Sequence, residues 1–156
     1  MTYRFIDVFI ITIPETLITL LVALQLLGLS PNFGKLMLVC TLQGFATYAI
    51  RQIHVYTLLH SLLQLLVCIL LVVYILKVDF KLVFVSLVIT VVVYGFIEQI
   101  FTSLVLSILH VSLYEVMKNQ LLELVAFSPQ FLFMILVYFL LRRFNLTLTN
   151  TYSKEE

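Results

Sequence analysis

The sequence predicts an all-α integral membrane protein, a single bundle of about five transmembrane helices. Of its 156 residues, 63 % are hydrophobic and only 11 % are charged, against about 45–50 % and about 25 % in soluble domains. A surface this apolar suits lipid, where the backbone must satisfy its own polar groups as a helix or a closed barrel. Five stretches reach about 20 mostly apolar residues, the length that carries a helix across about 30 Å of hydrocarbon.

The first three spans are separated by clear breaks. The first covers about residues 5–29 and ends at Gly28 and Ser30-Pro31-Asn32, residue types that terminate helices. The second covers about 33–53. The third covers about 55–76 and is followed by the charged segment that begins at Lys77.

The last two spans complete one bundle over residues 1–145. The fourth covers about 82–101, and the fifth covers about 121–141 and ends at Arg142-Arg143. Residues 146–156 form a short polar tail, which we expect in the cytoplasm.

The segment between these two spans has two interpretations. Its polar residues recur every three or four positions and so share one helical face: Ser103, Ser107, His110, Tyr114 and Lys118. This pattern predicts an amphipathic interfacial helix near 102–119. The alternative is a sixth span, which would require a tight turn near Glu98-Gln99, where the sequence has neither Gly nor Pro.

The distribution of basic residues predicts the orientation, because Lys and Arg are enriched on the cytoplasmic side of short loops. With five spans and a cytoplasmic C-terminus, six basic residues lie inside: Lys35, Lys77, Lys81, Arg142, Arg143 and Lys154. Three lie outside: Arg4, Arg51 and Lys118.

Polar side chains at membrane depth are the candidate ligand-binding residues, since an ionisable group there costs several kcal/mol unless it faces protein or water. Six fall in the outer half of the predicted bundle: Glu15, Arg51, His60, Gln64, Glu98 and Gln130. The inner halves of the helices are almost wholly apolar. We therefore predict a water-accessible cavity open to the outside, which would receive a small molecule or a peptide.

The same residues allow simpler interpretations. They would also serve as hydrogen bonds between helices, with Arg51 and Glu98 as a neutralising pair. A substrate-binding subunit of a membrane transporter, or a purely structural partner of another membrane protein, would use similar residues. A transporter, however, needs polar contacts along the inward path, and these are sparse.

The sequence does not indicate an enzyme. It has no phosphate-binding Gly-rich loop and no metalloprotease or serine hydrolase motif. His60 and Cys68 lie eight residues apart, about 12 Å along one helix, whereas a catalytic pair needs contact at about 3 Å. We expect no metal and no cofactor. A net charge of +1 without a basic stripe argues against a nucleic-acid partner.

Three features resemble a known family. They are Ile13-Pro14-Glu15-Thr16-Leu17 in the first span, the compact loops, and Leu141-Arg142-Arg143-Phe144 after the last span. Over about residues 5–145 the pattern is similar to the membrane sensor region of Gram-positive sensor histidine kinases of the accessory-gene-regulator type. The chain departs from that family because no phosphoacceptor helix and no ATP-binding glycines follow Asn145.

The resemblance implies a receptor-like sensing module in a bacterial cell membrane. Without a kinase domain, such a module would bind a signal but would not phosphorylate anything. We therefore expect it to act through a protein partner in the membrane or at the cytoplasmic face.

Overall fold

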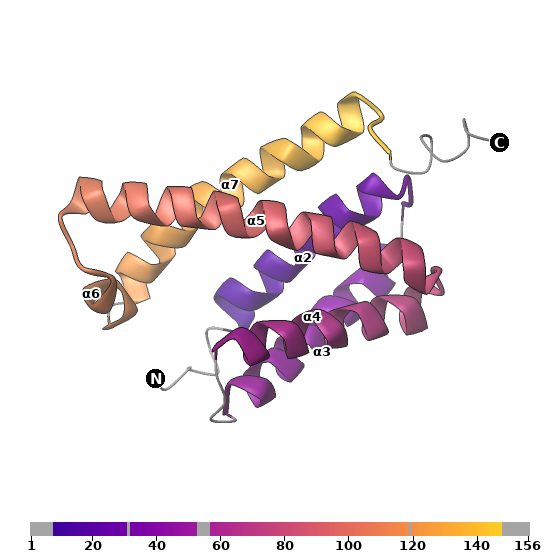
Figure 1. Cartoon of the computed structure of the whole chain (residues 1–156), viewed down its shortest axis with the longest axis horizontal. Helices are drawn as coiled ribbons and strands as arrows, with labels where there is room; N and C mark the ends of the chain where they lie inside the picture. The colour runs from indigo at the N-terminus through magenta and orange to yellow at the C-terminus, as the bar shows by residue number, and fades with distance from the viewer. Residues whose placement is uncertain (1–7, 31, 53–56, 119, 148–156) are drawn as a thin grey trace.

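The computed structural model describes residues 8–30, 32–52, 57–118 and 120–147, and every element in them is helical. In chain order they are η1 (Val8–Thr12), α2 (Ile13–Leu26), α3 (Phe33–Gln52), α4 (Thr57–Leu76), α5 (Phe80–Leu109), α6 (Leu113–Lys118) and α7 (Gln120–Arg143) (Figure 1). Five helical segments in this part of the chain are long and apolar enough to cross a membrane. The predicted all-α, multi-pass membrane bundle is confirmed.

Helix α2 is the centre of the bundle. It packs against α3, α5 and α7, while α3 also packs against α4, and α5 against both α4 and α7. Successive long helices run in alternating directions, so that the α2–α3 and α4–α5 connections lie at the same end (Figure 1). Short connections favour this antiparallel arrangement of neighbouring helices.

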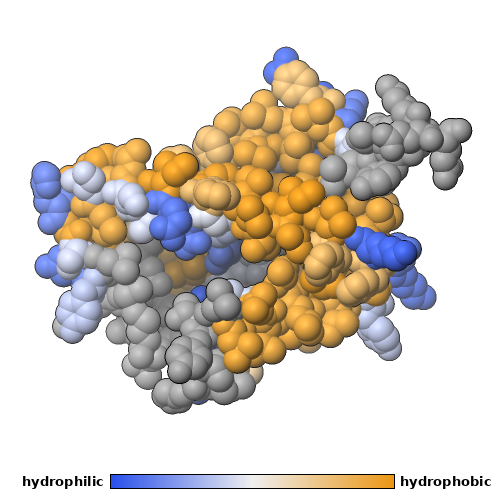
Figure 2. All heavy atoms as spheres, viewed as in Figure 1, coloured by the Kyte–Doolittle hydropathy of each residue, from blue (hydrophilic) through white to orange (hydrophobic). Residues whose placement is uncertain are grey.

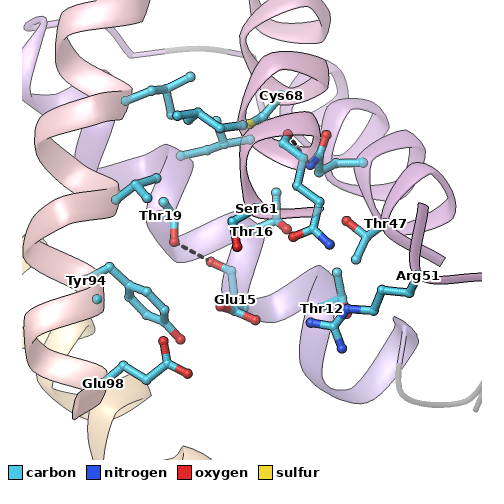
Figure 3. A pocket seen from close by; sticks show the side chains of 17 residues that line it. Thr12, Glu15, Thr16, Thr19, Thr47, Arg51, Ser61, Cys68, Tyr94 and Glu98 are labelled. Carbon is cyan, nitrogen blue, oxygen red and sulfur yellow. Dashed lines mark hydrogen bonds between the residues drawn. The ribbon is translucent and has the colours of Figure 1, made fainter. Parts of the chain in front are cut away.

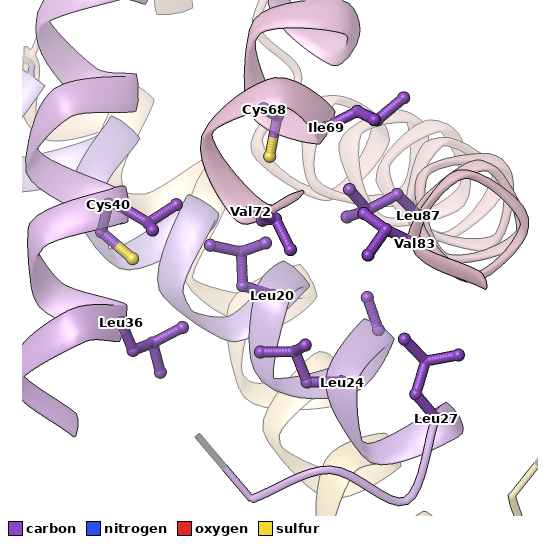
Figure 4. Packing of buried hydrophobic residues seen from close by; sticks show 12 residues of the cluster. Leu20, Leu24, Leu27, Leu36, Cys40, Cys68, Ile69, Val72, Val83 and Leu87 are labelled. Carbon is purple, nitrogen blue, oxygen red and sulfur yellow. The ribbon is translucent and has the colours of Figure 1, made fainter. Parts of the chain in front are cut away.

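The main core joins four helices at the end where α2 finishes. Leu20 and Leu24 of α2 meet Leu36 of α3, Val72 of α4 and Val83 of α5, all nearly inaccessible (Figure 4). A second cluster contains Ile18 and Val22 of α2, Tyr94 of α5 and Met134 of α7. These two clusters fix the position of α2 among its neighbours.

The outer face of the bundle is apolar. Many large hydrophobic side chains are exposed on α4, α5 and α7, including Leu66, Phe96 and Leu136. Figure 2 shows a predominantly hydrophobic surface, with hydrophilic residues at its ends and in one further patch over α5. In lipid this surface needs no further covering, because hydrocarbon tails take the place of water.

Two helix ends are fixed by local hydrogen bonds. Gly28 has a φ of 68° and follows the last turn of α2, and the Leu29 and Gly28 amides donate to the carbonyls of Leu24 and Gln25 at 3.0 and 2.9 Å. This is the Schellman arrangement, which favours glycine at the left-handed position. At the start of α5, the Asp79 carboxylate accepts from the Lys81 amide at 2.8 Å.

Both intramembrane prolines are accommodated without a break in the helix. Pro14 lies just after the change from π-helix η1 to α-helix α2, consistent with proline interrupting the regular hydrogen-bond ladder. Pro129 lies inside α7 and leaves the carbonyl of Val125 without an amide partner. The Ser128 hydroxyl donates to that carbonyl at 3.1 Å, as expected where no water is available.

The segment after Glu98 differs in detail from the prediction. Helix α5 continues through Glu98-Gln99 to Leu109, so the turn needed for a sixth span is not present there. The predicted helix near 102–119 is divided: its first part belongs to α5, and α6 follows a left-handed residue, His110, with a φ of 52°. Val105 of α5 and Val116 of α6 pack together with Ala126 of α7.

We predict that the two ends of this bundle lie on opposite sides of the membrane. Asn32 in the α2–α3 connection and Ser112 in the α5–α6 connection are both exposed. These two connections lie at opposite ends of the bundle (Figure 1). Single cysteines at these positions, in a background where Cys40 and Cys68 are alanine, should react with an impermeant thiol reagent from different sides. Labelling of both cysteines from one side would contradict the five-span arrangement.

We also predict a lowered pKa for Glu115, which lies in the first turn of α6 outside the spanning helices. The Ser112 amide and hydroxyl donate to its carboxylate at 2.7 and 2.9 Å and lower its pKa. Because the charged form is favoured, this stabilisation of α6 is present above the ordinary carboxyl pKa and is lost as pH falls through the lowered value. NMR titration should show Ser112→Ala raising the pKa of Glu115.

A Ser107→Ala variant is the matched control for this titration, because it removes a hydroxyl from the same end of the molecule. It should leave the Glu115 titration unchanged. A Glu115 that titrates in the ordinary carboxyl range with Ser112 intact would show that the capping contact does not form in solution.

Candidate functional site

A cavity of about 440 Å³ lies between α2, α3, α4 and α5. All four helices contribute polar groups to its wall, as Figure 3 shows. The polar lining residues are Thr12, Glu15, Thr16, Thr19, Gln43, Thr47, Arg51, Ser61, Gln64, Tyr94 and Glu98. Since polar side chains avoid lipid, their convergence explains why each of these helices carries a polar face.

The cavity has a polar mouth and an apolar floor. Arg51 and Glu98 are exposed and form the rim at the end where α3 finishes. Leu20, Cys68 and Leu87 line the opposite end and belong to the main hydrophobic core. The cavity therefore opens towards one end of the bundle and is closed towards the other.

Glu15 is at the centre of this site. It lies within electrostatic reach of both Glu98 and Arg51, and these side chains point towards one another from three different helices (Figure 3). The Tyr94 hydroxyl lies within interaction range of the Glu15 carboxyl group. The arrangement joins α2, α3 and α5 through charged and hydrogen-bonding groups.

Several of the hydroxyl groups on these helices bond within their own helix. The Thr19 hydroxyl donates to the Glu15 carbonyl at 2.8 Å, and the Thr90 hydroxyl donates to the Ser86 carbonyl at 2.7 Å. Ser86 likewise donates to the Val83 carbonyl and is buried with Thr90 outside the cavity. Such hydroxyls need no ligand, because each has a backbone acceptor one turn away.

The amide of Gln43 is only half satisfied. Its Nε2 donates across the helix interface to the Gln64 carbonyl oxygen at 2.9 Å. Its Oε1 is buried and has no hydrogen-bond partner among the described residues. Because a carbonyl oxygen only accepts, the amide cannot be turned round without losing the existing bond. The wall thus presents an unpaired acceptor.

Gln130 connects the site to α7. Its Nε2 donates to the Tyr94 hydroxyl oxygen at 3.2 Å, and the Gln130 side chain is buried. Tyr94 in turn reaches Glu15. A chain of interacting polar side chains, Glu15, Tyr94 and Gln130, therefore runs from the cavity centre to α7, the helix that carries Pro129 and ends at Arg143.

Four of the six residues predicted from the sequence line the cavity, namely Glu15, Arg51, Gln64 and Glu98. Gln130 is not in the lining and hydrogen-bonds to Tyr94, which is. His60 is half-buried on α4 and is not part of the lining, and its Nδ1 has no partner in the described part of the chain. Gln43 and Tyr94 were not predicted as site residues. A signal was present, because residues four or eight positions apart share a helical face, and Gln43 lies eight positions before Arg51 and Tyr94 four positions before Glu98.

Comparisons of the chain with protein-family models, with curated proteins and with solved structures found no match. The geometry therefore defines the protein only by class. It is a multi-pass helical membrane protein with a charged cavity that opens at one end of the bundle.

We predict that this cavity is accessible to water. In the background without native cysteines, Thr16→Cys places a thiol on the cavity wall, whereas Ser86→Cys places one in the sealed core on a neighbouring helix. A small, charged thiosulfonate reagent should modify Thr16→Cys at least about ten times faster, because only that thiol ionises in contact with water. Equal rates would contradict an open cavity.

Proposed function

We propose that this protein is a receptor-like sensing module, which binds a small molecule or peptide in the cavity and signals through a protein partner. The observation that carries the proposal is the link from Glu15 through Tyr94 to Gln130. It joins a ligand-sized space to a separate transmembrane helix. Cavities of about 300–1,000 Å³ with a few placed polar groups are typical of small-ligand sites.

The link supplies a physical route for a signal. A ligand that engages Glu15 competes with the Tyr94 hydroxyl for the same carboxyl group. Displacement of Tyr94 removes the acceptor of the Gln130 amide, whose Oε1 already has no partner in the part of the chain that the structure describes. A buried, unsatisfied amide costs roughly 1–3 kcal/mol. That is enough to favour a different position of α7.

The basic residues support the proposed orientation. Lys35 and Lys81 lie in the first turns of α3 and α5, and Lys77 follows the end of α4. Helix α7 finishes at the same end of the bundle, with Arg142 and Arg143 in its last turn (Figure 1). The positive-inside tendency then makes this end cytoplasmic and the cavity mouth external. A partner protein would contact α7 at the cytoplasmic end. The resemblance to sensor regions of accessory-gene-regulator-type kinases agrees with this assignment and with a bacterial cell membrane.

A transporter subunit is the second candidate, and the cavity floor argues against it. The space ends on Leu20, Cys68 and Leu87, which are buried in an apolar core shared by four helices. A permeating polar solute would have to cross that core. A receptor needs access from one side only.

We predict that Glu15→Gln and Arg51→Ala reproduce the phenotype of a deletion. In host cells that express only the variant chain, the transcript profile should match that of cells without the chain. Gln130→Leu should do the same, because it removes the link to α7 and leaves the cavity lining intact. The matched control is Val92→Ile, a lipid-facing change on α5, which should behave as wild type.

Membrane levels of each variant, and of any partner that co-purifies with it, separate loss of signalling from loss of protein. A receptor predicts that Glu15→Gln keeps its partner while the response is lost. Wild-type profiles for both Glu15→Gln and Arg51→Ala would exclude a role of the cavity in signalling. Loss of solute uptake together with an ATPase partner would favour the transporter instead.

A further inference from the structure

The charges that line the cavity do not balance. Glu15 and Glu98 contribute two carboxyl groups, and Arg51 contributes one guanidinium; the other described lining residues are uncharged. With all three ionised, two negative charges against one positive leave a net charge of −1. Arg51 is already within electrostatic reach of both carboxyl groups. The excess negative charge attracts a cation, and this attraction is stronger between the helices than in bulk water.

The unpaired hydrogen-bonding group in the wall points to the same chemistry. Gln43 is 5 % exposed, and its Oε1 is an acceptor with no donor among the described residues. The Tyr94 hydroxyl is already engaged by Glu15 and Gln130. The Gln43 Oε1 therefore lacks a donor among the described residues, and a positively charged N–H group is both a donor and a cation.

The size and floor of the cavity indicate an organic ligand. The volume of about 440 Å³ compares with about 30 Å³ for one water molecule in the liquid, so a bare metal ion would leave most of the space unfilled. Leu20, Leu65, Leu87 and Val91 supply apolar wall beyond the carboxyl groups. A ligand that fills the space has an apolar body and one charged end.

We infer that the cavity binds an organic monocation, a protonated amine on an apolar body, with the ammonium group between Glu15 and Glu98 and one N–H directed to the Gln43 Oε1. This inference rests on the proposed function and names the chemical class of its ligand. The apolar body lies towards Leu20 and Leu87.

Thermal unfolding of the purified full chain in detergent tests the inference. Cys40 and Cys68 are 0 % and 9 % exposed, so a thiol-reactive fluorogenic dye reports unfolding. The probes are n-hexylamine hydrochloride, sodium hexanoate and sodium chloride at equal ionic strength. Hexylammonium should raise the unfolding temperature of the wild type in a saturable way, and the other two salts should not.

Substitutions assign the effect to the cavity. Glu15→Gln and Glu98→Gln should each weaken hexylammonium binding about tenfold or more, the size expected for loss of a charge-assisted hydrogen bond. Gln43→Met should weaken it several-fold. The Glu15→Gln/Glu98→Gln double variant retains only Arg51 and should prefer hexanoate. Glu115→Gln removes a carboxyl group from α6, far from the cavity in sequence, and should bind as wild type.

These comparisons also control for the detergent, because partition of hexylammonium into micelles affects every variant equally. Glu98 lies at the exposed rim, so Glu98→Gln carries the test if Glu15→Gln does not fold. The inference is overturned if hexylammonium fails to stabilise the wild type, if Glu98→Gln binds it as tightly, or if sodium chloride or hexanoate gives the same effect.

The result is independent of the test of the receptor function. In one outcome the purified wild type binds hexylammonium, but Glu15→Gln changes no transcript in host cells. This outcome would overturn the receptor function and leave the amine site standing. A wild type that is indifferent to hexylammonium, with a response that still depends on Glu15, would overturn the amine class and leave the receptor.

Discussion

A carboxyl group at membrane depth must be surrounded by protein or water, and this constraint organises the bundle around α2. Glu15 lies on that helix with Thr16 and Thr19 on the same cavity wall, so α2 cannot present this face to lipid. Helices α3 and α5 pack on α2 and bring Arg51, Tyr94 and Glu98 to the same space. The opposite end of α2 is apolar, and its leucines form the core that closes the cavity.

Polar side chains in the bundle form two kinds of hydrogen bond, one within a single helix and one between helices. Hydroxyls such as those of Ser86 and Thr90 bond to their own helix and require nothing from their neighbours. The longer side chains of Gln43 and Gln130 bond across helices, and each leaves a buried oxygen without a partner among the described residues. A ligand or a rearrangement that supplies a donor to such an oxygen gains a hydrogen bond that the described bundle lacks.

The sequence was sufficient for the helical class, the five spans and most of the cavity. Length and apolarity determine spans directly, and Glu15, Arg51 and Glu98 stand out because charge is rare at depth. The end of α5 was not predictable, since Ser103 and Ser107 fit a spanning and an interfacial helix equally well. Nor was the exclusion of His60, because the rotation of α4 is set by packing with α3 and α5, which periodicity within one helix does not define.

The length of α5 has a consequence for the bilayer itself. At about 1.5 Å per residue, its 30 residues extend about 45 Å, against about 30 Å of hydrocarbon. Counted from Phe80, Glu98 lies about 27 Å along the axis, close to where the acyl chains give way to headgroups. In a thicker membrane the boundary lies beyond Glu98, which is then surrounded by acyl chains. In a thinner membrane Glu98 lies among headgroups and water. Hydrophobic mismatch therefore acts directly on the residue at the rim.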